Sequence, residues 1–210
     1  MGDTGEIVDA LLDTTKRRIE AFCEVRLNNG TSVYELIEEL SRGLQKIGEG
    51  YGERYFDAEL MVSGWNAKKA LEILKPLFHE WRIGEAKGKL GKIVVGTVKG
   101  DVHDIGKEIL IIMLSAAGFE VIDLGINVDK ETFADVVKET GADILALSAL
   151  LTTTREYMAE VTEYLRSSGL NVKIMVGGGA VNADYAAKIG ADAYGRDAVE
   201  AVKKAKELLG

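Results

Sequence analysis

The sequence predicts an α/β protein, in which a doubly wound sheet of five parallel strands follows a small four-helix bundle. Two observations lead to this fold class. From residue 92 onward, short runs rich in Val and Ile alternate with glycine-bearing loops and helical stretches, which is typical of βα units. Before about residue 85, apolar residues recur at helical spacing, and no segment reads as a strand. A closed eight-stranded barrel needs about 200 residues or more, so the second part fits an open sheet.

The N-terminal part reads as four helices separated by three breakpoints. In the first stretch, apolar residues at helical spacing continue up to Gly30, which favours a helix end. A second helix is expected over residues 31–49, because Ser32 and Glu35 have the spacing of a capping box. Pro76 is expected to break a third helix and to start the fourth.

The second part alternates between strands and helices. Strands are expected at residues 92–98, 120–124, 144–148, 173–176 and 191–194. Helices are expected at residues 106–117, 130–140, 154–168, 182–189 and 197–209. The glycine-rich segment 84–91 has the composition of a linker, so we expect two domains, residues 1–88 and 89–210.

Composition argues against several classes of function. The formal net charge is -8 and the chain has no basic stripe, which disfavours binding to nucleic acid. The longest apolar runs are far shorter than the ~18 residues of a membrane-spanning helix, so no membrane is expected. Cys23 has no second cysteine to pair with and the N-terminus lacks a secretory signal, so the expected location is cytoplasmic. Cys23, Trp65 and Trp81 are expected in the helical core.

Unusual residues follow the predicted first, third and fourth strands. The first of these loops reads KGDVHDIG (99–106), the next SALLTTT (148–154), and the last begins with Gly177-Gly178. Because the carboxyl ends of parallel strands share one edge, we expect the loops to line a groove for a bulky ligand. The fingerprints of dinucleotide and P-loop binding are missing, and a phospho-accepting receiver would need an aspartate in place of Ser148.

His103 follows Asp101 by two residues in a glycine-flanked turn. There a carboxylate can accept the proton of one ring nitrogen and leave the other nitrogen for a metal. The alternative, a surface or structural histidine, stays open on local context. The chain has two histidines and one cysteine, which are too few ligands for a typical tetrahedral zinc site. A metal bound by His103 would therefore have to arrive as part of the ligand.

The three loops resemble the cobalamin-binding domain of B12-dependent methyltransferases and mutases, whose motif is D-x-H-x-x-G, S-x-L, G-G. The matching segments are DVHDIG (101–106), SAL (148–150) and Gly177-Gly178. The helical part resembles the cap module of methionine synthase and of small corrinoid proteins. The resemblance implies a Rossmann-like or flavodoxin-like B12-binding domain behind a cap domain. The implied cofactor is cobalamin or a related corrinoid, methylcobalamin included, with its cobalt.

The resemblance also implies roles for single residues. His103 would be the lower axial ligand to cobalt, with Asp101 hydrogen-bonded behind it. Thr154 stands where a serine completes a proton relay in methionine synthase. Gly177 and Gly178 would leave clearance for the nucleotide tail of the cofactor. The residues expected to contact the cofactor are Gly100, Asp101, Val102, His103, Asp104, Ile105, Gly106, Ser148, Leu150, Thr152, Gly177, Gly178, Tyr194 and Ala198, with Phe56, Met61 and Val62 from the cap.

The function implied is that of a methyl carrier, the corrinoid subunit of a multi-component methyltransferase system. Its cob(I) form would accept a methyl group from a substrate-specific methyltransferase whose donor is methanol, a methylamine or a methoxylated aromatic. A second methyltransferase would load the group onto tetrahydrofolate or a thiol, and a reductive activator would rescue oxidised cofactor. Two alternatives are a B12-dependent sensor or regulator, which usually adds a basic DNA-binding domain, and the cofactor subunit of a B12-dependent mutase, which generally lacks the cap.

Overall fold

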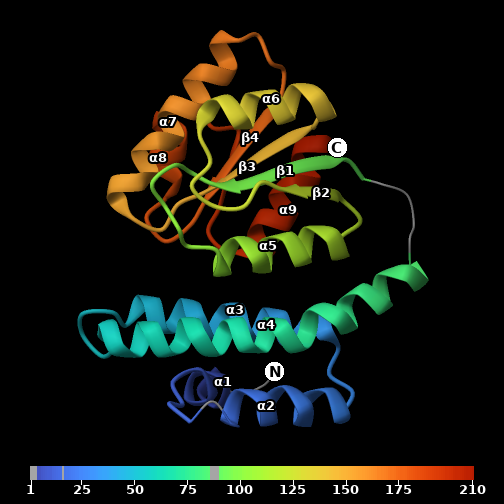
Figure 1. Cartoon of the computed structure of the whole chain (residues 1–210), viewed down its shortest axis with the longest axis vertical. Helices are drawn as coiled ribbons and strands as arrows, with labels where there is room; N and C mark the ends of the chain where they lie inside the picture. The colour runs from blue at the N-terminus through green and yellow to red at the C-terminus, as the bar shows by residue number, and fades with distance from the viewer. Residues whose placement is uncertain (1–3, 16, 86–89) are drawn as a thin grey trace. The chain divides into compact units, whose positions relative to one another are not determined.

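The structure, a computed structural model, describes residues 4–15, 17–85 and 90–210, with the side chains of residues 4 and 78–85 left out. The chain divides into two compact units, Met1–Glu85 and Ala86–Gly210 (Figure 1). Residues 86–89 of the expected linker lie outside the described residues. None of the helices within the described ranges is long and apolar enough to cross a membrane.

The described part of the first unit forms four helices, α1 (Thr4–Leu11), α2 (Arg17–Asn28), α3 (Val33–Glu49) and α4 (Asp57–Glu85). The predicted capping box of α3 is confirmed, because Ser32 Oγ accepts from Glu35 N at 3.2 Å while the Glu35 carboxylate accepts from Ser32 N at 2.8 Å. Apolar residues of all four helices form the core, namely Ile7, Leu11, Ile19, Cys23, Leu36, Ile37, Leu40, Ile47, Ala67, Ala70, Leu71 and Leu74.

One observed helix break was not predicted, and one predicted break is wrong. The stretch before Gly30 consists of two helices, α1 and α2, and Pro76 lies inside α4. Proline removes one helical hydrogen bond but its fixed φ suits a helix. Packing of α4 against the other three helices can offset that loss. Figure 1 shows the last turns of α4 tilted away from the rest of the helix, which a proline inside a helix explains.

The prediction of a core position for Trp65 is also wrong, since 55% of this residue is exposed. The buried stripe of α4 has helical spacing and comprises Ser63, Asn66, Ala67, Ala70, Leu71 and Leu74. Trp65 lies off this stripe, as does Met61, which is 77% exposed. Small residues on the stripe leave little room for an indole between the helices. Cys23 is buried as predicted, and the side chain of Trp81 lies outside the described residues.

Between residues 90 and 210 the chain forms five parallel strands, β1 (Lys92–Thr97), β2 (Glu120–Asp123), β3 (Ile144–Ser148), β4 (Lys173–Gly177) and β5 (Ala193–Gly195). Their order is β2-β1-β3-β4-β5, which confirms the predicted fold class. The chain leaves β1 toward one edge of the sheet and, after β2, crosses to β3 on its other side. The point between β1 and β3 is therefore the switch point, where open α/β sheets bind ligands.

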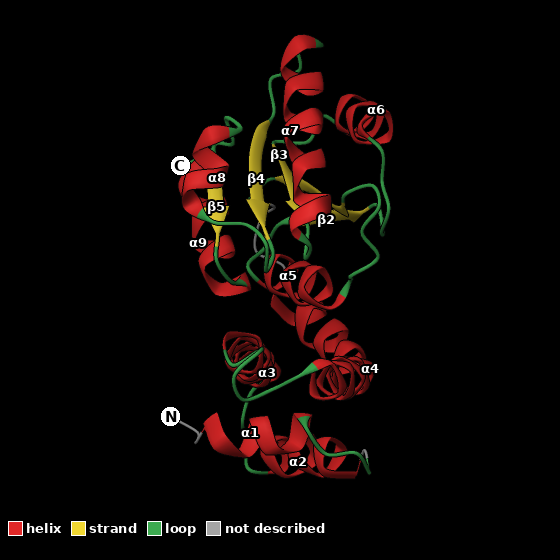
Figure 2. Cartoon of the chain, turned by 90° about the vertical axis from the view of Figure 1, so that its left-hand side faces the viewer, coloured by secondary structure: helices red, strands yellow, loops and turns green. Residues whose placement is uncertain are grey.

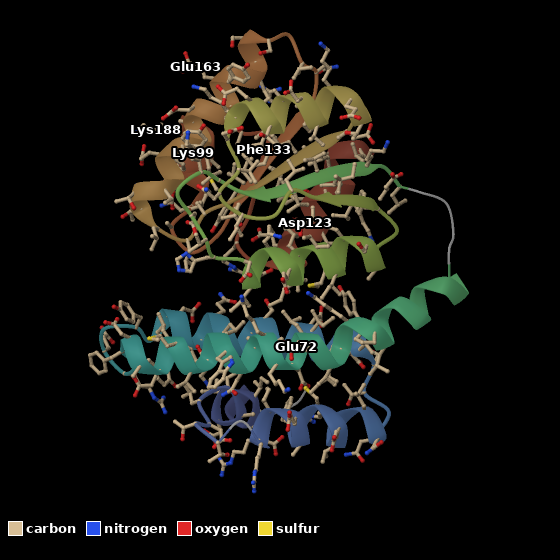
Figure 3. All side chains as sticks on the ribbon, viewed as in Figure 1. Glu72, Lys99, Asp123, Phe133, Glu163 and Lys188 are labelled. Carbon is tan, nitrogen blue, oxygen red and sulfur yellow. The ribbon has the colours of Figure 1, made fainter. Side chains whose placement is uncertain are left out.

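Five helices cover the sheet, α5 (Ile105–Ala116), α6 (Lys130–Thr140), α7 (Thr152–Ser167), α8 (Ala183–Lys188) and α9 (Ala198–Leu209). Helices α5 and α9 pack together on one face, and α6 and α7 lie on the other (Figure 2). The core on the α6–α8 face includes Phe133, Met158 and Tyr185. Gly96 in β1 makes room for Phe133, labelled in Figure 3, because a Cβ at residue 96 would lie 2.6 Å from the phenyl ring.

Candidate functional site

The loops after β1 and β3 lie beside each other at the switch point of the sheet. Thr97 and Ser148, the last residues of these strands, are in register, and Val98 N donates to the Ser148 carbonyl at 3.1 Å. The β1 loop then turns at Gly100, whose φ of +83° favours glycine. This arrangement brings Asp101 to the start of the β3–α7 connection.

Asp101 is fully buried, and one of its carboxylate oxygens bonds within its own loop while the other bonds to the β3–α7 connection. Its Oδ1 accepts from His103 N at 3.0 Å and lies 2.7 Å from His103 Nδ1. Its Oδ2 accepts from Thr154 Oγ1 at 2.6 Å and from Leu150 N at 2.8 Å. The structure thus brings together Asp101, His103 and Thr154, although 53 residues of sequence separate Asp101 from Thr154.

The hydrogen bonds keep the carboxylate of Asp101 charged. Burial alone would raise its pKa, but hydrogen bonds from the Thr154 hydroxyl and from the His103 and Leu150 amides lower that pKa to about 2. An ionised carboxylate at Nδ1 favours the tautomer with the proton on Nδ1 and a lone pair on Nε2. The His103 side chain is 46% exposed, so this second nitrogen is accessible to a ligand.

Other predicted site residues occupy the same edge of the sheet. Val102 is 63% exposed and Leu150 is 45% exposed. Asp104 and Ile105 lead into α5, Gly106 lies in its first turn, and Thr152 is the exposed first residue of α7. Two more exposed apolar side chains follow β2 and β3, namely Ile126 at 42% and Leu151 at 45%. Leu151 belongs to the predicted groove loop 148–154, whereas sequence reasoning missed Ile126, although a large apolar residue soon after a predicted strand is a usable signal.

Gly177 and Gly178 have a structural role within the protein, whereas their expected role in leaving clearance for the nucleotide tail stays a prediction. A Cβ at residue 178, where φ is +115°, would overlap the backbone carbonyl of Ala149, and one at residue 177 would lie 2.8 Å from the Gly195 carbonyl oxygen. Both glycines are thus required by neighbouring backbone within the protein. Tyr194 in β5 is partly buried against the core, and Ala198, the first residue of α9, is only 8% exposed.

The cap residues expected at the cofactor belong to the first unit. Phe56, directly before α4, is 57% exposed, and Met61 in α4 is 77% exposed. Val62 is half-buried. Phe56 and Met61 therefore lie on the surface of the helical unit and contribute little to its core.

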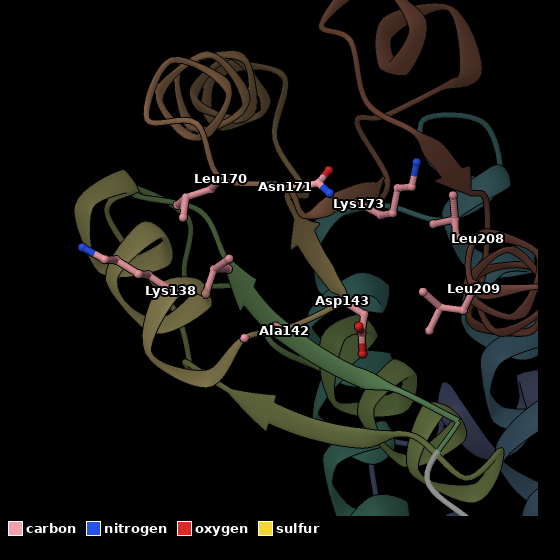
Figure 4. Close-up of a pocket in the computed structure, with 10 residues that line it drawn as sticks. Lys138, Ala142, Asp143, Leu170, Asn171, Lys173, Leu208 and Leu209 are labelled. Atoms are coloured by element: carbon pink, nitrogen blue, oxygen red, sulfur yellow. The ribbon is translucent and has the colours of Figure 1, made fainter.

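Two further features near the sheet edges were not predicted. Lys107 in α5 is buried and its Nζ lies 2.6 Å from Asp123 Oδ1 at the end of β2, so the ion pair anchors the first turns of α5 (Asp123 is labelled in Figure 3). A pocket lies at the opposite edge, before β3 and β4 and beside the end of α9 (Figure 4). None of the predicted site residues lines that pocket, so it is separate from the candidate site.

The residues at the carboxyl edge fit a corrinoid. In the described part of the chain, no group of three His, Cys, Asp or Glu side chains could hold a metal ion by itself. His103, oriented by Asp101, offers a single imidazole. It would supply one nitrogen ligand to a metal whose other ligands come with the cofactor. Exposed Val102, Ile126 and Leu150 offer apolar surface to a large ring.

Comparison with known proteins identifies the family. Residues 91–203, more than half of the chain, match the B12 binding domain, and the protein belongs to this family. It is a corrinoid protein of a methyltransferase system with cobalamin or a related corrinoid as cofactor, which confirms the assignment made from the sequence. The chain is 45% identical over 179 residues to dimethylamine corrinoid protein 1 of Methanosarcina acetivorans, with 83% of each chain covered.

Solved structures agree with this assignment. The monomethylamine corrinoid protein of Methanosarcina barkeri matches with a TM-score of 0.84 and 30% identity, over 96% of both chains. The methanol:cobalamin methyltransferase complex of the same organism matches with a TM-score of 0.56 and 28% identity, over 98% of this chain and 79% of that one.

Proposed function

We propose that this protein is the methyl carrier of a methylamine methyltransferase system. It holds the corrinoid on His103 and receives a methyl group from a partner methyltransferase that binds a methylamine. It then delivers the group to a second methyltransferase, which loads tetrahydrofolate or a thiol. Similarity to dimethylamine and monomethylamine corrinoid proteins supports the amine as donor. When bound, the corrinoid supplies the cobalt centre that carries the methyl group.

The observation that carries this proposal is the buried Asp101 carboxylate, bonded to His103 on one side and to Thr154 on the other. Asp101 fixes the Nδ1–H tautomer and raises the basicity of Nε2, which is the atom proposed to bind cobalt. Thr154 donates to Asp101 and also lies 3.1 Å from the Leu151 carbonyl oxygen. Thr154 is half-buried, so we assign its hydroxyl the outer position of a proton relay to Asp101.

The rest of the chain has supporting roles in the proposal. The edge residues from Gly100 to Gly106, with Ser148, Leu150 and Thr152, contact the ring and tail of the corrinoid, and the tail ends toward Tyr194 and Ala198. Residues 1–88 act as the cap domain and residues 89–210 as the corrinoid-binding domain. Phe56, Met61 and Val62 shield the methyl face and exclude water from it. A reductive activator restores carrier that has been oxidised.

The decisive experiment measures histidine ligation. The protein is loaded with cob(II)alamin, with and without nitrogen-15 histidine, and its electron paramagnetic resonance spectrum is recorded. The chain has two histidines, so H103A and H79A form a matched pair. We expect labelling to change the superhyperfine splitting in the wild type and in H79A but not in H103A. A label effect that persists in H103A, or that is missing from the wild type, contradicts the assignment of His103.

The donor and the acceptor are tested separately. Loaded carrier is mixed with a methylamine methyltransferase and each methylamine, and methylation of the cofactor is followed by its visible spectrum. The methylated carrier is then offered to a tetrahydrofolate-dependent or a thiol-dependent methyltransferase. Methylation by methanol and its methyltransferase, but by no amine system, contradicts the proposed donor.

A further inference from the structure

The loop that carries Asp101 and His103 is held from a second side by Asn127, in the connection between β2 and α6. Asn127 Oδ1 accepts from Gly100 N at 2.8 Å. The Asn127 N–H donates to the Asp101 carbonyl at 3.1 Å. Asn127 thus makes two hydrogen bonds to the backbone of Gly100 and Asp101, shortly before His103.

The backbone of Asn127 is unusual. Within residues 4–15, 17–85 and 90–210, it is the one non-glycine residue with positive φ, at +54°. This left-handed region disfavours most side chains but tolerates Asn and Asp. In this conformation both the backbone amide and the side-chain oxygen of Asn127 bond to the loop after β1. Asn127 is exposed, so burial in the core does not account for it.

These bonds complement those made by the Asp101 carboxylate. The carboxylate ties the loop to Leu150 and Thr154 after β3, whereas Asn127 ties the backbone at Gly100 and Asp101 to the connection after β2. Thr97 Oγ1 also donates to the His103 carbonyl at 3.0 Å, so the loop is anchored on both sides of Asp101. Without the Asn127 side chain the Gly100 amide loses its acceptor, and we expect the short contact between Asp101 and His103 Nδ1 to loosen.

We propose that Asn127 is a positioning residue for His103, which keeps the imidazole in the tautomer and orientation needed for an axial ligand. The inference rests on the proposed role of His103, but its first test does not require a corrinoid. Asn127→Gly retains the left-handed backbone and the N–H and removes only the side-chain acceptor. Asn127→Asp retains an acceptor oxygen. Asn171→Gly, in an exposed connection at the opposite edge of the sheet, is the control.

The readout is the ratio of the Nδ1–H to the Nε2–H tautomer of the His103 ring, measured by nitrogen-15 NMR of the protein without corrinoid at about pH 9. We expect this ratio to fall about threefold in N127G, because one net hydrogen bond to backbone is lost. It should stay near the wild-type value in N127D and N171G. Loaded with cob(II)alamin, N127G should show a mixture of spectra with and without the histidine coupling.

An unchanged tautomer ratio in N127G overturns the positioning role, and so does a ratio that falls equally in N127D. Failure of histidine ligation in the wild type would instead overturn the proposed function. The two failures are distinguishable because the ring measurement uses protein without corrinoid.

Discussion

Replacing Thr154 by Val tests how the Asp101 charge is held. Valine keeps the shape of threonine but removes the hydroxyl that donates to Asp101 Oδ2 at 2.6 Å. A hydrogen bond to a charged group contributes about 1.5–3 kcal/mol, so T154V should lower the free energy of unfolding by about 2 kcal/mol at pH 7. The same loss should raise the pKa of Asp101 by roughly one to two units. T154S keeps the hydroxyl and should remain close to the wild type.

The pH dependence of this effect has a defined sign. The pKa of Asp101 is about 2 in the folded protein against 3.8 for an unperturbed aspartate, so its stabilising effect is present above pH 3.8 and is lost as the pH falls toward 2. At 1.36 kcal/mol per unit, the shift corresponds to about 2 kcal/mol. The difference between T154V and the wild type should therefore shrink below about pH 3.8.

Amide hydrogen exchange of buried residues in β1 and β3, such as Val94 and Leu145, measures this stability. Tryptophan fluorescence is unsuitable because Trp65 and Trp81 both belong to the first unit. Equal amide protection in T154V and the wild type at pH 7 would refute the reasoning. A difference in protection that is as large at pH 3 as at pH 7 would also refute it.

Three more predictions concern the glycines, the cysteine and the cap. Gly178→Ala should destabilise the protein by at least about 2 kcal/mol in urea unfolding. Gly125→Ala, at φ +79° with no atom near its Cβ, should cost only about 1 kcal/mol, and equal costs would contradict the packing argument. Burial raises the pKa of Cys23 to about 11, so Ellman's reagent should label it only after unfolding, and fast labelling of the native protein would contradict that environment. With methylcobalamin bound, Phe56→Ala should speed photolysis, whereas Val25→Ala should leave its rate unchanged, and equal rates would contradict shielding by Phe56.

The strands could be predicted closely because each signal was local. For β3 and α6 the predicted and observed bounds coincide, at Ile144–Ser148 and Lys130–Thr140. Helix α6 is bounded by Asp129, whose side chain accepts from Thr132 N, and by Gly141 at φ +61°. These are the local signals for a helix start and a helix end. Runs of Val and Ile marked the strands in the same way.

The helical unit was harder to predict because long-range contacts decide its breaks. The end of α1 is fixed by Asn66, which donates to the carbonyls of Leu11 and Asp13 at 2.8 and 2.9 Å. More than fifty residues separate these partners, so local periodicity could not indicate that α1 and α2 are separate helices. Pro76 shows the reverse case, in which a strong local break signal does not end a helix that packs against the other three helices.

In the candidate site, the spacing of Asp101 and His103 indicated their contact, whereas Asn127 carried no sequence signal. The bonds that this loop receives from neighbouring connections depend on the position of β1 between β2 and β3 in the sheet. Because β1 has a neighbour on each side, the loop after it can receive bonds from the β3–α7 connection through Leu150 and from the β2–α6 connection through Asn127. A loop that follows an edge strand would have such a connection on one side only. The strand order therefore explains how the loop that carries Asp101 and His103 is held from two sides.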